Sequence, residues 1–490
     1  MEREPVAAAD LSALPKPGLL IGGEKLAEAR LGHDHRYPAT GEVTNRVPLA
    51  SAVEIDAAVK AARAALPGWR GMAVNERRKL MLKFAALIRE KKGDLARLAT
   101  AENGAPQMQV QGLPGLTAEF FEYYAGWADK IGGEVVTTWP GPAFDYTLEE
   151  PYGVIGVIVP WNGPVVSFGQ LTAPAIAAGN CVVIKPPELA PYSCLRLGEI
   201  ALEAGIPPGV INVVAAGPEG GEALTRHPGV DKLHFTGSGA TAKKILAGAL
   251  TNLTPVGLEL GGKSARLVFA DADLPSAVRN AIACVISNAG QGCISGTRIL
   301  VEASLYDSFV ADCQQALEAI KIGDPRAPAT VMGPVISQAA CDRILGFISR
   351  AQEAGGRLVT GGQRLGGELA GGYFIGPTMF ADVDNRAEIA REEIFGPVIA
   401  FIPFKDDEDA VRIANDSEFG LAAYIETENL RRVHRLAPVL EAGGITVNAS
   451  FFNMCPAAPF GGNKQSGVGR IGGLAGLREF TRPKNVYLKM

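Results

Sequence analysis

The sequence predicts an α/β protein with two doubly wound α/β domains and a small β domain. Between residue 153 and about residue 447, short apolar runs alternate with helical stretches, as expected of parallel sheets with right-handed helical crossovers. At 490 residues, the chain is longer than one hydrophobic core usually organises. Two short extended segments near residue 140 and an extended C-terminus predict the third unit. We expect the three domains over 1–130 with 152–261, over 262–460, and over 131–151 with 461–490.

The first 130 residues predict loops followed by helices. Gly and Pro are frequent in the first fifty residues, which favours loop or extended structure. A helical pattern begins at Val53, and Pro67-Gly68 is expected to end it. A second helix is expected over 76–91, and further helices to about Lys130.

Residues 134–150 predict two strands around Pro140-Gly141-Pro142. A two-stranded ribbon is only marginally stable alone. We therefore expect this ribbon, together with the extended segment at 484–490, to pack against another subunit.

Regular alternation begins at Gly153. The run Val154–Val159 is apolar throughout, as in a strand buried on both faces. The next strands are expected at 181–184, 211–214 and 232–235, and the helices at 193–204 and 240–250. The second α/β region begins near Gly262, and its first elements are a helix over 275–288, a loop at Cys293 and a strand over 298–301.

Composition excludes several classes of protein. The net charge is −5, from 47 basic and 52 acidic residues without a basic block, so a nucleic-acid partner is not expected. Seven scattered cysteines without a CxxC pair, and only five histidines, argue against a disulfide framework and against a metal site. The absence of an apolar signal core and of a run of 18 apolar residues predicts a cytoplasmic protein without a membrane span.

Cys293 in GQGC and Glu259 in LELGGK are the main candidate catalytic residues. A thiolate is a strong nucleophile at neutral pH, and a nearby carboxylate is a suitable general base. Taken singly, a cysteine is more often a packing residue, and Glu259 could be an ordinary paired carboxylate. Their glycine-rich flanks favour the catalytic interpretation.

A Rossmann-like turn follows the strand expected at 232–235. Gly237, Gly239 and Ala242 fit G-x-G-x-x-G/A, and Glu259 lies about twenty residues further on, where the fingerprint places its ribose-binding acid. A tight turn into a helix is the alternative for the glycines. We interpret Glu259 as the base rather than the ribose ligand, because more glycines follow it and Cys293 needs a base.

Polar residues follow two of the expected strands, at the sheet edge where ligands bind. Asn162, in PWN, could donate to an oxyanion, and the alternative is a turn-forming Asn. Lys185 and Glu188, in KPPE, could hold ribose hydroxyls, and the alternative is a surface ion pair in a Pro-rich turn.

Together these segments resemble the NAD(P)-dependent aldehyde dehydrogenase superfamily over essentially the whole chain. The motifs that carry the resemblance are PWN at 160–162, KPPE at 185–188, FTGS at 235–238, LELGGK at 258–263, GQGC at 290–293, EEIFGPV at 392–398 and PFGG at 459–462.

The resemblance implies a cofactor domain, a catalytic domain and an oligomerisation domain for the three units. It implies that Cys293 is the nucleophile, that Glu259 is the general base, and that Asn162 and the Cys293 backbone N–H form the oxyanion hole. The implied cofactor-binding residues are Trp161, Lys185, Glu188, Gly237, Ser238, Glu393 and Phe395.

The implied reaction is oxidation of an aldehyde to a carboxylic acid through a cysteine thiohemiacetal and thioester, with hydride transfer to the nicotinamide and hydrolytic deacylation. NAD is the expected cofactor and NADP the alternative, since Glu188 would repel a 2′-phosphate. The expected assembly is a homodimer or homotetramer. The alternatives are a cysteine hydrolase, for which His227 and His234 lack motif support, a catalytically silent relative, and a CoA-acylating relative, which would not need Glu259.

The chain departs from the family pattern at three positions. Leu171 stands where many relatives have Lys, Ala242 where Gly is common, and Ile471 where an acid is frequent. The helix after Asn162 is expected to line the aldehyde entrance, so its small residues predict a bulky, aromatic or medium-chain substrate. The residues expected around the aldehyde are Gly163, Ser167, Gln170, Leu171, Phe451, Phe452 and Phe460.

Overall fold

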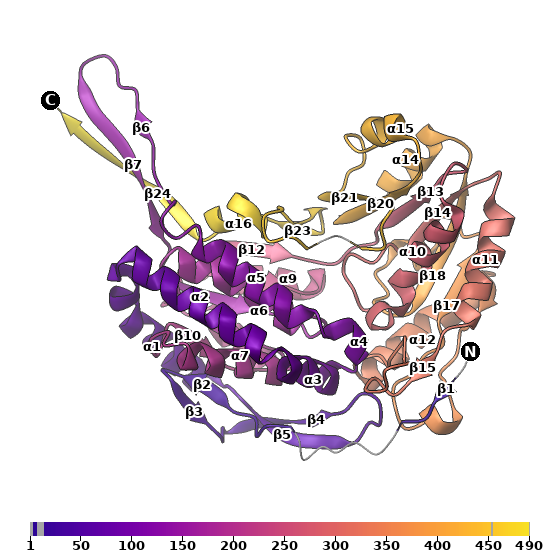
Figure 1. Ribbon diagram of the computed structural model, residues 1–490, viewed down its shortest axis with the longest axis horizontal. Helices are drawn as coiled ribbons and strands as arrows, with labels where there is room; N and C mark the ends of the chain where they lie inside the picture. Colours follow the sequence, from indigo (N-terminus) through magenta and orange to yellow (C-terminus); the bar gives the residue numbers. More distant parts are fainter. Residues whose placement is uncertain (1–2, 7–13, 452–453, 490) are drawn as a thin grey trace.

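The computed structural model describes residues 3–6, 14–451 and 454–489, and it contains two large sheets with a projecting β arm (Figure 1). Phe452, one of the expected pocket residues, lies outside this description. Within the described ranges, no helix is long and apolar enough to cross a membrane.

The first sheet has eight strands in the order β23-β12-β11-β8-β9-β10-β2-β3. The five strands from β12 to β10 are parallel, and the edge strands β23, β2 and β3 pair antiparallel. The strands are β2 (Leu19–Ile21), β3 (Glu24–Leu26), β8 (Val154–Ile158), β9 (Cys181–Lys185), β10 (Ile211–Val213), β11 (Lys232–Thr236), β12 (Val256–Glu259) and β23 (Gly467–Val468).

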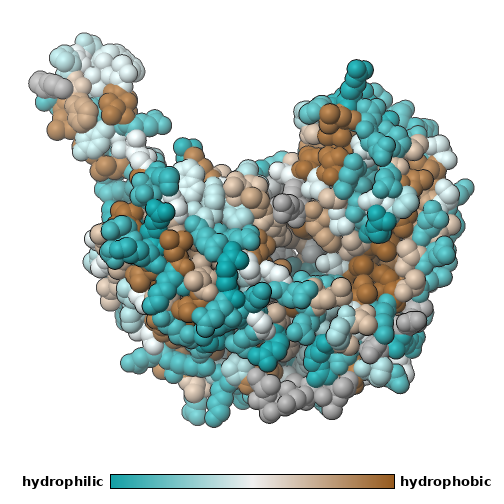
Figure 2. Space-filling view, viewed as in Figure 1, coloured by the Kyte–Doolittle hydropathy of each residue, from teal (hydrophilic) through white to brown (hydrophobic). Residues whose placement is uncertain are grey.

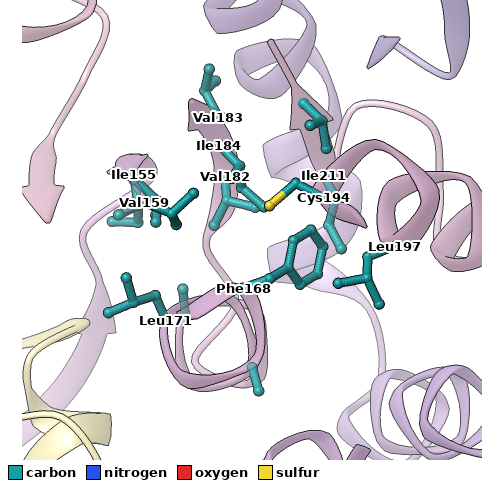
Figure 3. Close-up of a cluster of buried hydrophobic side chains, with 14 of the residues drawn as sticks. Ile155, Val159, Phe168, Leu171, Val182, Val183, Ile184, Cys194, Leu197 and Ile211 are labelled. Carbon is teal, nitrogen blue, oxygen red and sulfur yellow. The ribbon is translucent and has the colours of Figure 1, made fainter. Parts of the chain in front are cut away.

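Helices from three parts of the chain pack on or beside this sheet. They are α1 (Ala52–Gly71), α2 (Val74–Glu90), α3 (Lys92–Asn103), α4 (Gln107–Val110), α5 (Leu113–Ala125), α6 (Pro164–Ala177), α7 (Tyr192–Glu203), α8 (Pro218–Thr225), α9 (Gly239–Ala249) and α16 (Gly473–Arg478). The buried helix α6 lies against the parallel strands, where Phe168 and Leu171 meet Val159, Val182 and Cys194 (Figure 3).

The second sheet has seven strands in the order β16-β17-β18-β14-β13-β20-β21, and only β16 is antiparallel to its neighbour. Its strands are β13 (Ala265–Val268), β14 (Arg298–Glu302), β16 (Arg357–Thr360), β17 (Thr378–Ala381), β18 (Val398–Phe404), β20 (Ala422–Glu426) and β21 (Gly444–Val447). Its helices are α10 (Leu274–Ile286), α11 (Tyr306–Glu318), α12 (Gln338–Glu353), α13 (Glu388–Arg391), α14 (Asp407–Asn415) and α15 (Leu430–Leu436). A separate hydrophobic core surrounds this sheet.

The β arm consists of β6 (Val135–Val136), β7 (Ala143–Pro151) and β24 (Thr481–Lys489). The C-terminal strand β24 pairs antiparallel with β7 along its whole length, from Thr481 opposite Pro151 to Lys489 opposite Ala143. Figure 1 shows the arm projecting from the body, with the C-terminus near its tip. The structure thus joins the predicted ribbon and the predicted terminal strand in one sheet.

Short strands complete the fold. They are β1 (Arg3–Glu4) with β15 (Ile322–Gly323), β4 (Leu31–Arg36) with β5 (Val43–Leu49), and β19 (Phe419–Gly420) with β22 (Asn463–Lys464). The predicted α/β class with two wound sheets and a small β unit is confirmed. The exact domain boundaries stay a prediction, and β23, from the 461–490 segment, pairs with the first sheet before the chain enters the arm.

The predicted end of the first helix is wrong. Helix α1 continues through Pro67 to Gly71. Proline removes one hydrogen bond from a helix interior, but the following turn carries Trp69, which is 1% exposed and donates its Nε1 hydrogen to the Ile176 carbonyl at 3.1 Å. Burial of this large side chain stabilises the additional turn, which the local sequence pattern does not reveal.

Candidate active site

Cys293 follows a strained loop at the end of α10. Asn288, Ala289 and Gly290 have φ of 47°, 51° and 72°, so three successive residues are left-handed. This conformation costs about 1–2 kcal/mol for each non-glycine residue, and it persists where the surroundings hold it. The Gln109 side chain accepts from Asn288 N at 2.8 Å, and a Cβ on Gly290 would lie 2.1 Å from the Gly396 carbonyl oxygen. The loop is therefore fixed from both sides.

Cys293 differs in exposure from the other cysteines of the chain. Five of the seven cysteines are buried and Cys455 is exposed, whereas Cys293 is half-buried. Burial, and then the charges of Glu393 and Glu259, raise the pKa of Cys293 to about 12, while backbone N–H groups at Ile294 and Cys293 lower it. Cys293 also packs against an apolar cluster of Ile294, Leu421, Ala422 and Tyr424, and so do Phe451, Met454 and Phe460.

Glu259 ends β12 and is 4% exposed, and both of its carboxylate oxygens are buried. Neither carboxylate oxygen has a hydrogen-bond partner within the described residues. Burial raises the pKa of Glu259 well above its usual value, the charge of Arg470 lowers it, and that of Glu479 raises it. Buried acceptors are nearly always satisfied in folded proteins, so this carboxylate is available for a ligand or water.

The backbone after Glu259 brings three candidate residues together. A Cβ on Gly262 would lie 2.7 Å from the Cys293 carbonyl oxygen. The Gly262 N–H donates to Oε1 of Glu393 at 3.0 Å. Burial raises the pKa of Glu393 to about 7, against the opposing effects of this bond and of the charges of Lys263 and Arg343. Glu259, Cys293 and Glu393 therefore all lie next to the short segment that contains Gly262.

Asn162 connects the first sheet to the Cys293 loop. It follows β8, and its Nδ2 donates to the Gln291 carbonyl at 3.0 Å. Asn288 Nδ2 in turn donates to the Asn162 carbonyl at 3.3 Å. One hydrogen of the Asn162 amide is used in this contact, which leaves the second hydrogen for a ligand.

The predicted cofactor-binding residues occupy neighbouring strand ends and loops. Trp161 and Phe395 pack edge to face, with ring centroids 5.3 Å apart and planes at 89°. Lys185 ends β9 and is 8% exposed; burial lowers its pKa, and the charge of Glu188 raises it. A buried cation near a carboxylate is suited to polar groups of a ligand.

The Rossmann-like turn lies next to the main chain of Glu259. Gly237 N donates to the Glu259 carbonyl at 3.0 Å. Ser238 is the N-cap of α9, since its hydroxyl accepts from Thr241 N at 3.3 Å. A Cβ on Gly239 would meet no described atom within 4 Å, so space for a ligand lies at this helix start. These features fit a dinucleotide.

The candidate site residues come from both large sheets. Asn162, Lys185 and Glu259 come from strand ends of the first sheet, and Cys293 and Glu393 come from loops of the second. Figure 2 shows the surface hollowed between the two lobes.

Leu171 and Ile471, two of the positions at which the chain departs from the family pattern, are both buried. Leu171 is 1% exposed in the core of the first sheet, so it does not line the aldehyde entrance as expected (Figure 3). Ile471 is likewise buried, and its backbone bonds to Phe460 in both directions. The sequence pattern did not indicate Glu479, because the charge that affects the pKa of Glu259 lies 220 positions further along the chain.

The geometry agrees with the comparisons with known proteins. The profile of the aldehyde dehydrogenase family matches residues 27–486. A curated aldehyde dehydrogenase of Emericella nidulans is 41% identical over 457 residues, covering 92% of this chain and 91% of the relative. The chain belongs to the aldehyde dehydrogenase family.

Two solved structures agree with this assignment. An NAD-dependent aldehyde dehydrogenase from Sinorhizobium meliloti has a TM-score of 0.95 at 36% identity, with 99% of this chain and 98% of the other covered. An E. coli NADP dependent enzyme has a TM-score of 0.94 at 37% identity, with 98% and 99% covered. This protein is thus an NAD(P)-dependent family enzyme with aldehyde dehydrogenase activity, and its relatives use either cofactor.

Proposed function

We propose that this aldehyde dehydrogenase converts its aldehyde to a carboxylic acid by covalent catalysis at Cys293, with Glu259 as the general base. The observation that carries the proposal is the buried Glu259 carboxylate, which lacks hydrogen-bond partners among the described residues and whose charge reaches Cys293. Such a group costs stability and is retained where chemistry needs it.

The first step is the formation of the thiolate. The raised pKa of Cys293 means that its thiol needs a base, and the raised pKa of Glu259 makes its carboxylate a stronger proton acceptor. The Cys293 sulfur then bonds to the aldehyde carbon. The free Asn162 N–H and the Cys293 backbone N–H donate to the oxygen that becomes negative.

Loss of hydride from the thiohemiacetal leaves a thioester on Cys293. When bound, the nicotinamide supplies the hydride acceptor and a positive charge that favours the thiolate. The Glu259 carboxyl first releases to solvent the proton that it took from Cys293. Its carboxylate then removes a proton from water, the hydroxide adds to the thioester carbonyl, the C–S bond breaks, and Glu259 passes its new proton to the leaving thiolate. The products are the carboxylic acid and the free thiol of Cys293.

The cofactor-holding residues in this proposal are Trp161, Lys185, Glu188, Gly237, Ser238, Glu393 and Phe395. The carboxylate of Glu188 would accept hydrogen bonds from both ribose hydroxyls of a bound cofactor, and its charge would repel a 2′-phosphate, so we expect NAD to be preferred over NADP. Specificity constants with both cofactors test this point: equal values would contradict it, and Glu188→Ala should reduce the preference.

The substrate is bulky, aromatic or of medium chain length. In support, a Cβ on Gly163 would meet no described atom within 4 Å, and Phe451 and Phe460 pack against the same apolar cluster as Cys293. Gln170 Nε2 donates to Met454 Sδ at 3.9 Å. A thioether sulfur is a weak acceptor, so this hydrogen bond is easily replaced by one to a substrate. Hexanal and benzaldehyde should therefore have higher kcat/KM than acetaldehyde, and Gly163→Phe should reverse the order.

The arm supports a homodimer or homotetramer. Apolar side chains on it are exposed, as Figure 2 shows, and they include Val135, Trp139, Phe144, Leu148, Tyr487 and Leu488. Exposed apolar groups gathered on a narrow β arm favour burial by another subunit.

The central test is the stoichiometry of product formation. The wild type should release NADH and carboxylic acid in equal amounts, and Cys293→Ala should release neither. The matched control is Cys455→Ala, which removes an exposed cysteine and should retain activity. Aldehyde oxidation by Cys293→Ala would exclude the covalent mechanism.

A further inference from the structure

Four polar side chains form a closed ring beneath the loop at 448–451. Arg266 Nη1 donates to Oε1 of Glu426, and Asn280 Nδ2 donates to both Glu426 oxygens at 3.3 and 3.1 Å. Ser450 Oγ donates to Oδ1 of Asn280 at 2.7 Å. Arg266 Nη2 closes the ring on the Ser450 carbonyl at 2.7 Å, and Nη1 also reaches the Ala449 carbonyl at 3.0 Å.

Three members of the ring are buried and lie on elements of the second α/β region, and Ser450 is half-buried in the loop. Arg266 lies on β13, Glu426 ends β20, and Asn280 lies on α10. The exposed side-chain fractions of Arg266 and Glu426 are 0% and 2%. Replacing such a pair by apolar residues of similar volume is often neutral or stabilising. Stability alone therefore does not explain why these charges lie here.

The ring contacts the Cys293 region by two routes. Arg266 stacks on Tyr424, with its guanidinium carbon 4.3 Å from the ring centroid, and Tyr424 donates its hydroxyl hydrogen to the Ile294 carbonyl at 2.8 Å. Ile294 is the residue after Cys293. On the other side, Ser450 is followed by Phe451, which packs in the apolar cluster that also contacts Cys293.

The loop at 448–451 has few other restraints. Asn448 is left-handed, with φ of 52°, and its side chain bonds to the backbone of Thr427. The next two carbonyls, of Ala449 and Ser450, are both held by the single guanidinium of Arg266. Because a guanidinium is a rigid planar fork, it fixes both carbonyls relative to β13.

We propose that Arg266, buried against Glu426, is a positioning residue that fixes Phe451 on the aldehyde side and Tyr424 beneath the Cys293 loop. It thereby sets the distance between the wall of the substrate pocket and the thiol. The inference rests on the proposed role of Cys293 and adds a determinant of aldehyde selectivity in residues that do not touch the substrate.

The test is the double variant Arg266→Met/Glu426→Leu, which removes both charges and leaves no buried charge unpaired. We expect the folded double variant to show an aldehyde KM raised by about tenfold to a hundredfold, since small misplacements have effects of this size. The KM for NAD should be unchanged, and the ranking of hexanal against benzaldehyde should change.

The matched control is Arg77→Met, which removes another buried arginine, on α2 beside the first sheet. It should lower thermal stability without changing the ranking of aldehydes. An unchanged aldehyde KM and ranking in the folded double variant would overturn the proposal, as would the same kinetic changes in Arg77→Met. Failure of the wild type to form the Cys293 thioester would instead contradict the proposed function.

Ser450→Ala keeps the ion pair and provides a second measurement if the double variant does not fold. It removes one hydrogen bond to Asn280, so the aldehyde KM should rise by about twofold to tenfold. Equal KM values for the wild type and Ser450→Ala, with both proteins folded, would also count against the proposal.

Discussion

Two buried glutamates in this protein differ in the hydrogen bonds that their carboxylates accept. Glu102, at the end of α3, accepts from Tyr192 N at 2.8 Å, from Ser193 N at 3.1 Å and from the Ser193 hydroxyl. Glu259, at the end of β12, accepts no hydrogen bond from any described residue. Both are nearly inaccessible, with exposed fractions of 0% and 4%.

The difference separates a role in folding from a role in chemistry. Burial raises the pKa of both carboxyls, to about 7 for Glu102 and well above the usual value for Glu259. Glu102 satisfies free N–H groups at the start of α7 and thus acts as a helix cap supplied by another helix. The Glu259 carboxylate makes no hydrogen bond to the described residues, and its unsatisfied oxygens are available for the thiol or water.

The largest expected effect is that of Glu259→Gln. Removal of the base should slow thioester hydrolysis by about 10²–10⁴-fold. A first turnover of NADH should still precede this slow phase, because the positive charge of the bound nicotinamide also favours the Cys293 thiolate. Thermal stability should be equal or higher, because a buried unpartnered carboxyl is lost. Rapid-mixing kinetics measure both phases. A strongly raised NAD dissociation constant with normal hydrolysis would show that Glu259 is a ribose ligand instead.

Glu102→Ala should lower stability and leave catalysis unchanged. It leaves three donors without an acceptor, so the free energy of unfolding should fall by at least about 3 kcal/mol. Activity per folded molecule should be unchanged. Urea unfolding measures the first quantity, and active-site titration corrects the second. The control is Glu119→Ala on α5, an exposed carboxylate that should change stability by less than about 0.5 kcal/mol. Lost catalysis in folded Glu102→Ala would contradict the separation of roles.

The raised pKa of Glu102 should also be detectable in the pH dependence of stability. Its pKa rises from 4.5 to about 7 on folding, so the folded state binds more protons between these values. Its contribution to stability is complete below pH 4.5 and falls by about 3 kcal/mol as pH rises to 7. His35, whose pKa burial lowers to about 4, has the opposite slope, so the wild type must be compared with Glu102→Gln.

The measurement is the difference in urea midpoint between the wild type and Glu102→Gln at pH 5 and pH 7.5. The wild type should lose stability relative to the variant at the higher pH. An equal difference at both pH values would show that Glu102 has the same pKa in the folded and unfolded states.

The smallest expected effect is a shift in the pH dependence of thioester hydrolysis when a charged residue near Glu259 is replaced. The charge of Glu479 raises its pKa and that of Arg470 lowers it. Glu479→Gln should therefore move the acid limb of thioester hydrolysis to lower pH, by less than about one unit. Arg470→Met should move it to higher pH. Shifts in the same direction would show that another group controls this limb.

Much of the fold and the chemistry is predictable because it is local. The continuous apolar run at 154–159 indicates a buried parallel strand, and the structure has β8 there. Glycine-rich loops around a cysteine and a carboxylate indicate a reactive site, and family membership is confirmed. The individual roles of the site residues stay predictions.

Other features could not be predicted because they depend on distant contacts. The ring of Arg266, Asn280, Glu426 and Ser450 joins residues up to 184 positions apart in sequence. Helix α1 passes Pro67 because Trp69 finds a partner 107 positions away. Leu171 is on the predicted helix, but the packing of α6 turns it toward the core rather than the aldehyde entrance.

The sequence by itself determined which residues can react, since the chemistry of a thiol, a carboxylate or an amide belongs to its side chain. It also determined where apolar periodicity forces strands and helices. Only the tertiary structure decided which buried carboxylate is satisfied and which is not. Glu102 and Glu259 are the same residue type, and their difference arises from whether folding brings N–H and O–H donors to the oxygens, which no local pattern specifies.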